Sequence, residues 1–384
     1  MNTLKIRKKQ IAVLALVLVL AVTFVTIAGC AGEKIRQSHT VVYKTDSHGS
    51  VVWESSLDTG MRDQGYTIIE TSDGGYLVAG FISDNPKGDP GHQVFPRVVR
   101  LDQAGRILWD TVLNTSYGSY DFKNAGCADA IGETPDKDVL VTTRKGFILT
   151  LDPAGNIKSA MRVNTSGFSL ISERDMSILI VQSEGVSKFN SSGFLVWKNP
   201  SWGDRMIFQT GDGGYCFESS NNSGKGTRDS TTCLDPNGTT LWEHVGEGLM
   251  REEITSFYEP SPGFIEVTYL REDRTRTEGL VIHPALTRSV LFDTTGKILA
   301  EKNLTASEPL IRTTEGGYAF SSGTYGSGGE YAANAYTRPI HIARLSQNGS
   351  LLWDRVLVNS TVGEKFPSSI IQTKDEGFAV LVIV

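Results

Sequence analysis

The side chains best suited to catalysis in this 384-residue chain are acidic, and four of them form two adjacent pairs on the expected loop face: Glu252 with Glu253, and Glu272 with Asp273. A glycoside hydrolase needs two carboxyl groups about 5 to 9.5 Å apart across its substrate. Adjacent positions in a sequence do not establish that distance. A glycan lyase or hydrolase that uses these residues is therefore an alternative function and not the leading prediction.

The other reactive side chains form no recognisable site. The six histidines are scattered without metal-ligand spacing, and the chain has no Gly-x-Ser-x-Gly segment and no phosphate-binding loop. Asp73, Asp212 and Asp375 each stand alone beside glycine, whereas calcium takes about six to eight oxygen ligands. We interpret them as turn residues and predict no metal site, no cofactor and no catalytic residue.

Composition and charge describe a globular chain that is unsuited to nucleic acid. Hydrophobic residues make up 39 % and charged residues 21 % of the chain, which argues against intrinsic disorder. The formal charge is −6, and four of the basic residues lie in the leader described next. Without them, 33 basic residues face 43 acidic ones, a charge of −10. A nucleic-acid partner is therefore not expected.

The N-terminus has the pattern of a secretory leader. A basic cluster at 5–9 precedes an apolar run at 11–28. The run ends in Ile-Ala-Gly-Cys at Cys30, which resembles the lipobox of bacterial and some archaeal lipoproteins and implies cleavage before a lipidated Cys30. An uncleaved anchor helix is the alternative, because the run approaches the roughly 20 residues that span a bilayer. Either way, we expect the rest of the chain outside the cytoplasm.

Eight of the fifteen asparagines lie in Asn-x-Ser/Thr sequons, the acceptors of N-glycosylation on exported surfaces. Three of these, Asn190, Asn237 and Asn348, fall in predicted turns, where Asn, Gly, Ser and Thr gather for conformational reasons. The sequons that we predict as glycosylation sites are Asn114, Asn164, Asn221, Asn303 and Asn359.

Two motifs alternate along the chain, seven times each. One reads apolar, apolar, x, Thr, x, Asp, Gly, Gly, aromatic, and is clearest from Ile68, Ile207, Leu310 and Ile370. The other reads apolar, Asp, x, x, Gly, x, apolar, apolar, Trp. Its Asp position falls at Asp46, Asp102, Asp152, Asn190, Asp235, Asp293 and Ser346. Six steps thus cover 300 residues, a mean of 50 for each unit.

Each motif predicts a β-hairpin with a tight turn. The Gly-Gly pair after Asp73 supplies the positive φ of such a turn, while Asp102 is suited to cap its own turn and Gly105 to take the left-handed position. Two hairpins at a period near 50, without helical periodicity between them, are typical of a four-stranded propeller blade. The chain opens with one hairpin, at 41–57, and closes with the other, at 368–384.

We therefore predict an all-β, seven-bladed β-propeller over residues 41–384, with a closing blade shared by the N-terminal and C-terminal hairpins. It follows a signal peptide at 1–29 and a tether at 30–40. The Thr-x-Asp-Gly-Gly-Tyr motif resembles the repeat of exported propellers of methanogenic archaea and some bacteria, and Leu-Asp-x-x-Gly-x-x-x-Trp resembles PQQ-like repeats. That family includes quinone-dependent dehydrogenases, which would be expected to have adjacent cysteines, and non-catalytic lipoprotein propellers such as the outer-membrane assembly component. This chain has no adjacent cysteines.

The predicted blades divide the ring into two faces. Turns within hairpins share one face, the tight-turn face, whereas connections between hairpins share the other, the long-loop face, and are long at 83–96, 111–126, 220–230, 271–288 and 323–339. Because loops carry function while the scaffold repeats, we predict ligand binding on the long-loop face. The aromatic and basic candidates there are Phe95, Tyr117, Tyr120, Trp202, His244, Arg271, Arg274, Arg276, Tyr331 and Tyr336.

Two further predictions concern packing and cysteines. Recurrent tryptophans such as Trp109 are interpreted as packing between blades. Cys216 and Cys233 occupy facing positions on neighbouring strands and predict a disulfide, which leaves Cys127 free. Together, these features predict a non-catalytic, monomeric propeller held by a lipid at the outer face of the cytoplasmic membrane, which binds a protein or polysaccharide of the cell surface. An envelope glycan-active enzyme and a structural spacer are the alternatives.

Overall fold

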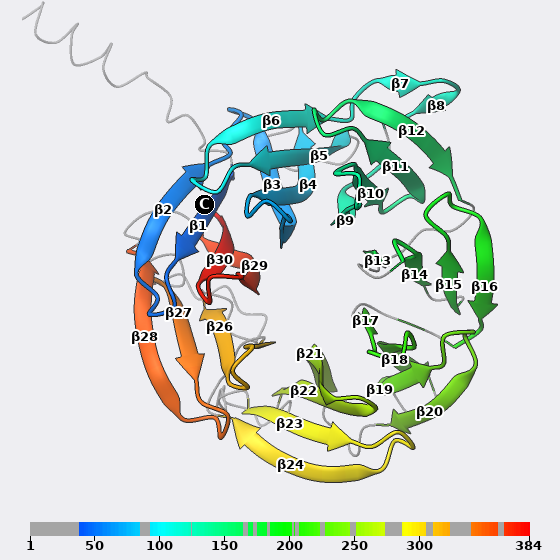
Figure 1. Ribbon diagram of the computed structural model, residues 1–384, viewed down its shortest axis with the longest axis vertical. Coiled ribbons are helices and arrows are strands. Elements are labelled where there is room, and N and C mark those ends of the chain that lie inside the picture. Colours follow the sequence, from blue (N-terminus) through cyan, green and yellow to red (C-terminus); the bar gives the residue numbers. More distant parts are fainter. Residues whose placement is uncertain are drawn as a thin grey trace, which may run out of the picture. The chain divides into compact units, whose positions relative to one another are not determined.

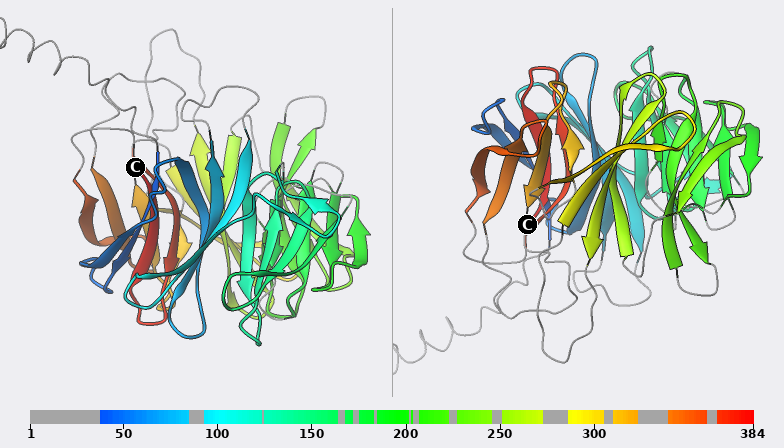
Figure 2. Two further views of the ribbon diagram at one scale, coloured as in Figure 1. Left: turned by 90° about the horizontal axis from the view of Figure 1, so that it is seen from above. Right: turned by 90° about the horizontal axis from the view of Figure 1, so that it is seen from below.

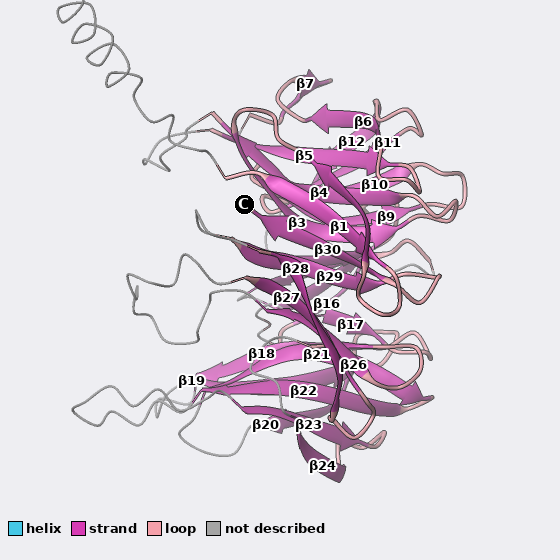
Figure 3. Cartoon of the chain, turned by 90° about the vertical axis from the view of Figure 1, so that its left-hand side faces the viewer, coloured by secondary structure: helices cyan, strands magenta, loops and turns pink. Residues whose placement is uncertain are grey.

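The computed structural model describes residues 38–84, 93–123, 125–163, 168–171, 175–182, 185–201, 203, 207–222, 227–245, 251–272, 286–304, 310–322, 339–359 and 365–384. Within these ranges the chain consists of strands, turns and loops (Figure 3). No helix of the described ranges is long and apolar enough to span a bilayer.

Seven sheets of four antiparallel strands form a ring (Figure 1). Blade 1 contains β3 (Arg62–Glu70), β4 (Tyr76–Ser83), β5 (Val94–Leu101) and β6 (Ile107–Val112); blade 2 contains β9 (Ala128–Glu133), β10 (Val139–Thr143), β11 (Phe147–Leu151) and β12 (Ile157–Arg162). Blade 3 contains β13 (Phe168–Ile171), β14 (Ile178–Gln182), β15 (Gly185–Phe189) and β16 (Leu195–Asn199); blade 4 contains β17 (Ile207–Gln209), β18 (Tyr215–Asn222), β19 (Thr227–Leu234) and β20 (Thr240–Val245). Blade 5 contains β21 (Arg251–Ser261), β22 (Phe264–Glu272), β23 (Leu286–Phe292) and β24 (Ile298–Leu304); blade 6 contains β25 (Ile311–Arg312), β26 (Tyr318–Ser322), β27 (Ile340–Leu345) and β28 (Leu351–Val358).

The seventh blade joins the two ends of the described chain, as the sequence predicts. Its strand order is β2 (Val51–Ser56), β1 (Thr40–Thr45), β30 (Phe378–Ile383), β29 (Phe366–Gln372). The apolar strand β30 is buried along its whole length and pairs with β1 from Thr40 opposite Ile383 to Thr45 opposite Phe378. Pairing removes an exposed strand edge that would otherwise invite aggregation.

The turn inside each outer hairpin is closed by its glycine and by the residue at its Asp position, which is Asn190 in blade 3 and Ser346 in blade 6. Asp102 Oδ1 accepts the backbone N–H groups of Ala104 and Arg106, both at 2.9 Å. Gly105 has a φ of +76°, which glycine adopts without steric penalty. The Asp-x-x-Gly spacing is therefore the signature of a self-capped turn. Figure 2 shows the tight turns of several blades at one end of the ring, opposite the C-terminal residue.

The strand tryptophans pack between blades, as predicted. A Cβ added to Gly105 of blade 1 would lie 2.5 Å from Cε3 of Trp53, which belongs to the closing blade. The Trp53 Nε1–H donates to the Gln103 carbonyl at 3.0 Å. This contact between an outer strand and the next blade's turn glycine occurs at all seven interfaces: Trp53 with Gly105, Trp109 with Gly155, Met161 with Gly193, Trp197 with Gly238, Trp242 with Gly296, Leu304 with Gly349, and Trp353 with Gly49.

Candidate functional site

The acidic turn residues of the tight-turn face stabilise their own blades. Asp73 Oδ1 accepts the Thr71 hydroxyl at 2.5 Å, and Asp73 Oδ2 accepts Arg100 Nη2 at 2.8 Å. The hydrogen bond from Thr71 is the largest contribution that lowers the pKa of Asp73 to about 2. The Thr-x-Asp spacing therefore stabilises the turn. Across the described residues, no group of three or more His, Cys, Asp or Glu side chains could hold a metal ion.

The same turns are also bonded to the following blade. The Ser72 N–H donates to Glu133 Oε2 at 2.7 Å, from blade 1 to the end of the innermost strand of blade 2. Three equivalent contacts join Lys374 N–H to Glu70, Thr314 N–H to Gln372, and Gly211 N–H to Glu259. At these four interfaces, the N–H groups of the tight-turn face are committed to holding blades together.

The interface between blades 5 and 6 has a buried charge cluster instead. Glu266 Oε1 accepts the hydroxyls of Ser289, at 2.5 Å, and Tyr318, and lies 3.2 Å from Lys302 Nζ, while Arg312 Nη2 lies 3.5 Å from Oε2. Burial by itself would raise the pKa of Glu266, but the two hydroxyl donors and the two cations outweigh it and hold the pKa below its usual value. Arg312 occupies the position of the carboxylate or amide acceptor at other interfaces, so this cluster replaces that contact.

The structure separates two aromatic candidates, Tyr117 and Tyr120, which the sequence places together on the long-loop face. Tyr117 and Tyr120 form a two-stranded hairpin of β7 (Ser116–Tyr117) and β8 (Tyr120–Asp121), which lies outside β12 at the perimeter of the ring (Figure 1). The Tyr117 hydroxyl donates to the carbonyl of Lys158, near the tight-turn end of β12, at 2.7 Å. The ring of Tyr120 lies 6.1 Å from that of Phe147. The expected placement of Tyr117 on the long-loop face is therefore wrong, because this segment folds back over the outside of blade 2, whereas Tyr120 stays beside Phe147, the first residue of β11 at the long-loop end.

The remaining aromatic and basic candidates are not gathered into one described surface. Phe95 lies opposite Ile82 at the long-loop end of blade 1. His244 packs against Phe292 of the next blade, with 4.9 Å between ring centroids. Arg271 lies near the end of β22. The candidates outside the described residues are Trp202, Arg274, Arg276, Tyr331 and Tyr336.

The carboxylates considered for glycan cleavage are not paired by the strand register. Glu252 lies opposite Arg271, and Glu253 lies opposite Leu270, in the β21–β22 ladder. Glu272 lies opposite Arg251 in the same ladder, and Asp273 falls outside the described residues. The described backbone therefore gives no support to a catalytic pair in this hairpin.

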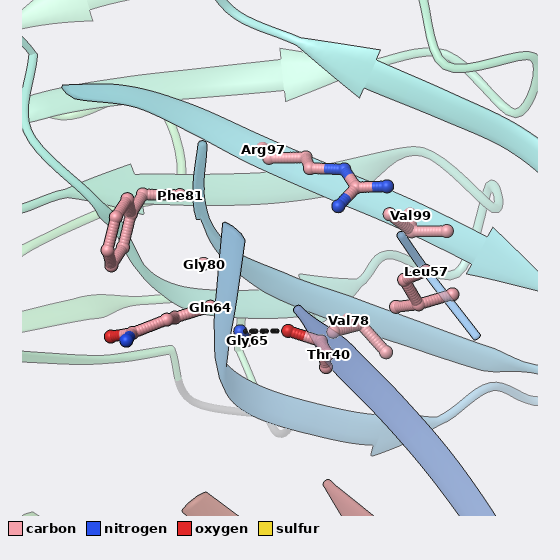
Figure 4. Close-up of a pocket in the computed structure, with 9 residues that line it drawn as sticks. All are labelled: Thr40, Leu57, Gln64, Gly65, Val78, Gly80, Phe81, Arg97 and Val99. Atoms are coloured by element: carbon pink, nitrogen blue, oxygen red, sulfur yellow. Dashed lines mark hydrogen bonds between the residues drawn. The ribbon is translucent and has the colours of Figure 1, made fainter. Parts of the chain in front are cut away.

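A small pocket opens beside β1 at the long-loop end of blade 1 (Figure 4). It has room for about one water molecule, far below the roughly 300 Å³ at which ligand pockets begin. Its lining consists of Thr40, Leu57, Gln64, Gly65, Val78, Gly80, Phe81, Arg97 and Val99. The pocket is thus a packing defect at the closing blade rather than a substrate cavity.

The charged groups near this pocket are fixed by one another. Arg97 binds Asp110 through Nε at 2.9 Å and Nη2 at 2.7 Å, and its Nη1 lies 3.4 Å from Asp63 Oδ1. The same Asp63 oxygen accepts the Thr40 N–H at 2.9 Å. Burial raises the pKa of Asp63, against the opposing effects of the Thr40 N–H and the Arg97 charge. These groups join the closing blade to blade 1 and leave no free base.

One exposed aromatic residue near the pocket was missed by the sequence analysis. Tyr66 is the extra residue of a β-bulge in β3, because Gly65 pairs with Gly80 and Thr67 pairs with Ala79. Bulges re-aim a side chain and are common beside functional sites. Tyr66 remains 37 % exposed although β3 is the innermost strand of its blade. The glycine at each side of the ladder, at 65 and 80, was the available signal.

The predicted disulfide lies within the described residues, as do several of the predicted glycosylation sites. Cys216 and Cys233 form a disulfide between β18 and β19, and Cys127 is free and half-buried. Of the five asparagines predicted as glycosylation sites, three are exposed, Asn114, Asn303 and Asn359. Asn164 and the side chain of Asn221 fall outside the described residues, as does Cys30.

Comparison with known proteins identifies the fold. No protein-family model and no curated protein matches the chain. Among solved structures, the WD40 domain of Pan2 from Neurospora crassa matches at a TM-score of 0.51 and 10 % identity, over 83 % of this chain and 89 % of that one. BamB from Moraxella catarrhalis matches at 0.43 and 13 %, over 83 % and 99 %. A protein of unknown function from Bacteroides caccae matches at 0.42 and 15 %, over 71 % and 95 %. The likeness to the Pan2 domain, at such low identity, shows the propeller architecture and not an activity.

Proposed function

We propose that this chain is a non-catalytic, extracytoplasmic propeller that is tethered through a lipid on Cys30 and binds a protein or glycan of the cell envelope through its long-loop face. The ring itself needs no partner to close, because its two terminal hairpins complete the seventh blade. The proposal assigns the tether to residues 30–40 and the binding surface to the connections between hairpins.

The contrast between the two faces carries the proposal. Turns on the tight-turn face are bonded to the next blade through contacts such as Ser72 with Glu133. The connections on the other face differ in length from blade to blade, from the short 144–146 of blade 2 to the long 323–339 of blade 6. The tight-turn face repeats from blade to blade and is occupied by contacts between blades. The long-loop face varies from blade to blade, as expected of the binding surface of a scaffold.

Anchoring has its own test. Cys30→Ser removes the acceptor thiol, so we expect the protein either to leave the membrane fraction or to remain uncleaved at a higher mass. The matched control is Cys127→Ser, which removes a thiol from the ring and should change neither property. Unchanged mass and membrane partitioning of the Cys30 variant would overturn the lipid anchor.

Binding and catalysis are separated by one combined experiment. The full chain in detergent is applied to a glycan array and, in parallel, cross-linked to envelope extract, and bound glycans are analysed for cleavage. A saturable ligand without cleavage is the expected result. Cleaved glycans would establish the enzyme instead, and the absence of any saturable ligand would leave the structural spacer.

A further inference from the structure

The bulged Tyr66 is held between aromatic and thiol neighbours. Its ring lies 5.5 Å from that of Phe81, at an angle of 48°. The guanidinium of Arg62 lies over the Phe81 ring at 5.8 Å from its centroid. Burial is the main cause that raises the pKa of Tyr66, followed by its interaction with Cys127, so the phenol stays neutral at physiological pH. Part of a fixed aromatic ring is thereby presented to solvent beside a cation.

Positive charge gathers around this ring, although the exported chain is acidic. Arg144 belongs to the adjoining blade 2, acts on the Tyr66 phenol, and binds Asp129 Oδ1 through Nη2 at 2.6 Å. The exposed Lys145 follows it and lies 3.7 Å, through Cγ, from a Cβ built on Gly126, the residue before the Cys127 that interacts with Tyr66. Among the described residues, neither Arg62 nor Lys145 forms an ion pair. Arg62, Arg144 and Lys145 face two carboxylates, Asp129 and the Asp84 that follows Ser83 opposite Arg62, so one positive charge is left in surplus at this end of the two blades. An anionic ligand would meet charge-assisted donors here.

The bulge decides between two kinds of anionic ligand. An extended acidic peptide would bind best by adding a strand to the free edge of β3. The bulge at Tyr66 interrupts the ladder at that point, and interrupted edges resist strand addition. A pyranose ring instead needs an aromatic surface for its apolar face and a guanidinium for its carboxylate.

We propose that Tyr66, Arg62 and Lys145 bind a uronic acid residue of an acidic glycan. Tyr66 contacts the apolar face of the sugar, while Arg62 and Lys145 bind its carboxylate. This inference rests on the proposed function, since it names the ligand class of the long-loop face and one place where that ligand binds.

Calorimetric titration of the full chain in detergent tests the inference, with trigalacturonate as the probe, maltotriose as its neutral counterpart and a hexaglutamate peptide as the competing class. Arg62→Gln and Tyr66→Ala should each weaken trigalacturonate binding by about tenfold or more, because charged hydrogen bonds and aromatic contacts contribute about 1.5 kcal/mol or more each. Tyr66→Phe keeps the ring and should bind within about twofold of the unchanged chain. Arg106→Gln removes an exposed arginine charge from the tight-turn face of the same blade and should have no effect.

Each other outcome overturns the inference. Binding of hexaglutamate in preference to trigalacturonate would assign the site to acidic peptides. Trigalacturonate binding that survives both Arg62→Gln and Tyr66→Ala, in variants that melt at the temperature of the unchanged chain, would place the sugar elsewhere. If trigalacturonate fails while another array glycan or envelope protein binds, this inference falls and the proposed function stands; if nothing binds, both fall.

Discussion

The contact between Trp53 and Gly105 joins the closing blade to blade 1, and a double-mutant cycle across it tests whether such contacts hold the ring together. Trp53→Ala removes a half-buried indole and its hydrogen bond to the Gln103 carbonyl. A fully buried Trp→Ala change costs about 3 to 5 kcal/mol, and a neutral hydrogen bond contributes about 1 kcal/mol. For half-burial we therefore expect a loss of about 2 to 3 kcal/mol.

Gly105→Ala introduces two separate strains. The new Cβ would lie 2.5 Å from Trp53 Cε3, and overpacking of this kind costs about 1 to 3 kcal/mol. The φ of +76° adds about 1 to 2 kcal/mol for any residue with a Cβ. When Trp53 is also alanine, the overpacking disappears and the backbone strain remains. The double variant should therefore be less destabilised than the sum of the single variants by about 1 to 3 kcal/mol.

Urea unfolding followed by circular dichroism measures the four free energies. Gly60→Ala provides the matched control, because Gly60 also has a positive φ, +74°, but a Cβ there would meet no atom within 4 Å. Its cycle with Trp53→Ala should be additive within about 0.5 kcal/mol. Additivity in the Gly105 cycle as well would refute the contact between indole and turn glycine as a source of stability.

Three further predictions concern other parts of the ring. Peptide mapping of exported protein should find Cys216 bridged to Cys233; finding both alkylated, or bridged elsewhere, would contradict this. Glu266→Gln should lower the free energy of unfolding by about 3 kcal/mol at pH 7, because it leaves the cations of the cluster without their carboxylate. Since the folded pKa of Glu266 is depressed, the difference in unfolding free energy between the unchanged chain and the variant should vanish as the pH falls through that pKa. A difference that does not change with pH would be inconsistent with an ionic origin. Deletion of 376–384 should cost far more solubility than deletion of the connection 83–91, and equal solubility and melting temperature would argue against a shared closing blade.

The fold could be predicted because each structural device repeats seven times. The Asp102 and Gly105 positions specify a self-capped turn from local chemistry alone, and a tryptophan equivalent to Trp53 meets the turn glycine of the next blade at five of the seven interfaces. Alternating hairpins at a fixed spacing then permit only one way to join the two termini. Such a periodic pattern can be recognised even where one copy is degenerate, as in blade 2, where Met161 contacts the turn glycine of the next blade in place of a tryptophan.

The exposed corner at Tyr66 could not be predicted because its cause is not periodic. The bulge depends on how closely β3 and β4 approach, where a Cβ on Gly80 would collide with the Gln64 carbonyl. The return of Tyr117 across blade 2 likewise depends on a long-range hydrogen bond to the Lys158 carbonyl. Neither the close approach of β3 and β4 nor this hydrogen bond can be predicted from a loop sequence. Residue type and loop membership alone therefore predict the wrong location for the Tyr117 side chain.

The claim at the centre of this account, that one face of the ring binds and the other does not, can be measured by steric blocking. In a Cys127→Ser background, Asp58→Cys on the long-loop side and Ala104→Cys on the tight-turn side of the neighbouring hairpin, both exposed positions, are each coupled to a polyethylene glycol maleimide. Binding of the labelled full chain to cell envelopes is then titrated. We predict that the label at position 58 weakens binding by about tenfold or more, while the label at position 104 changes it by less than about twofold. Loss of binding from the label at 104, with none from the label at 58, would contradict the account.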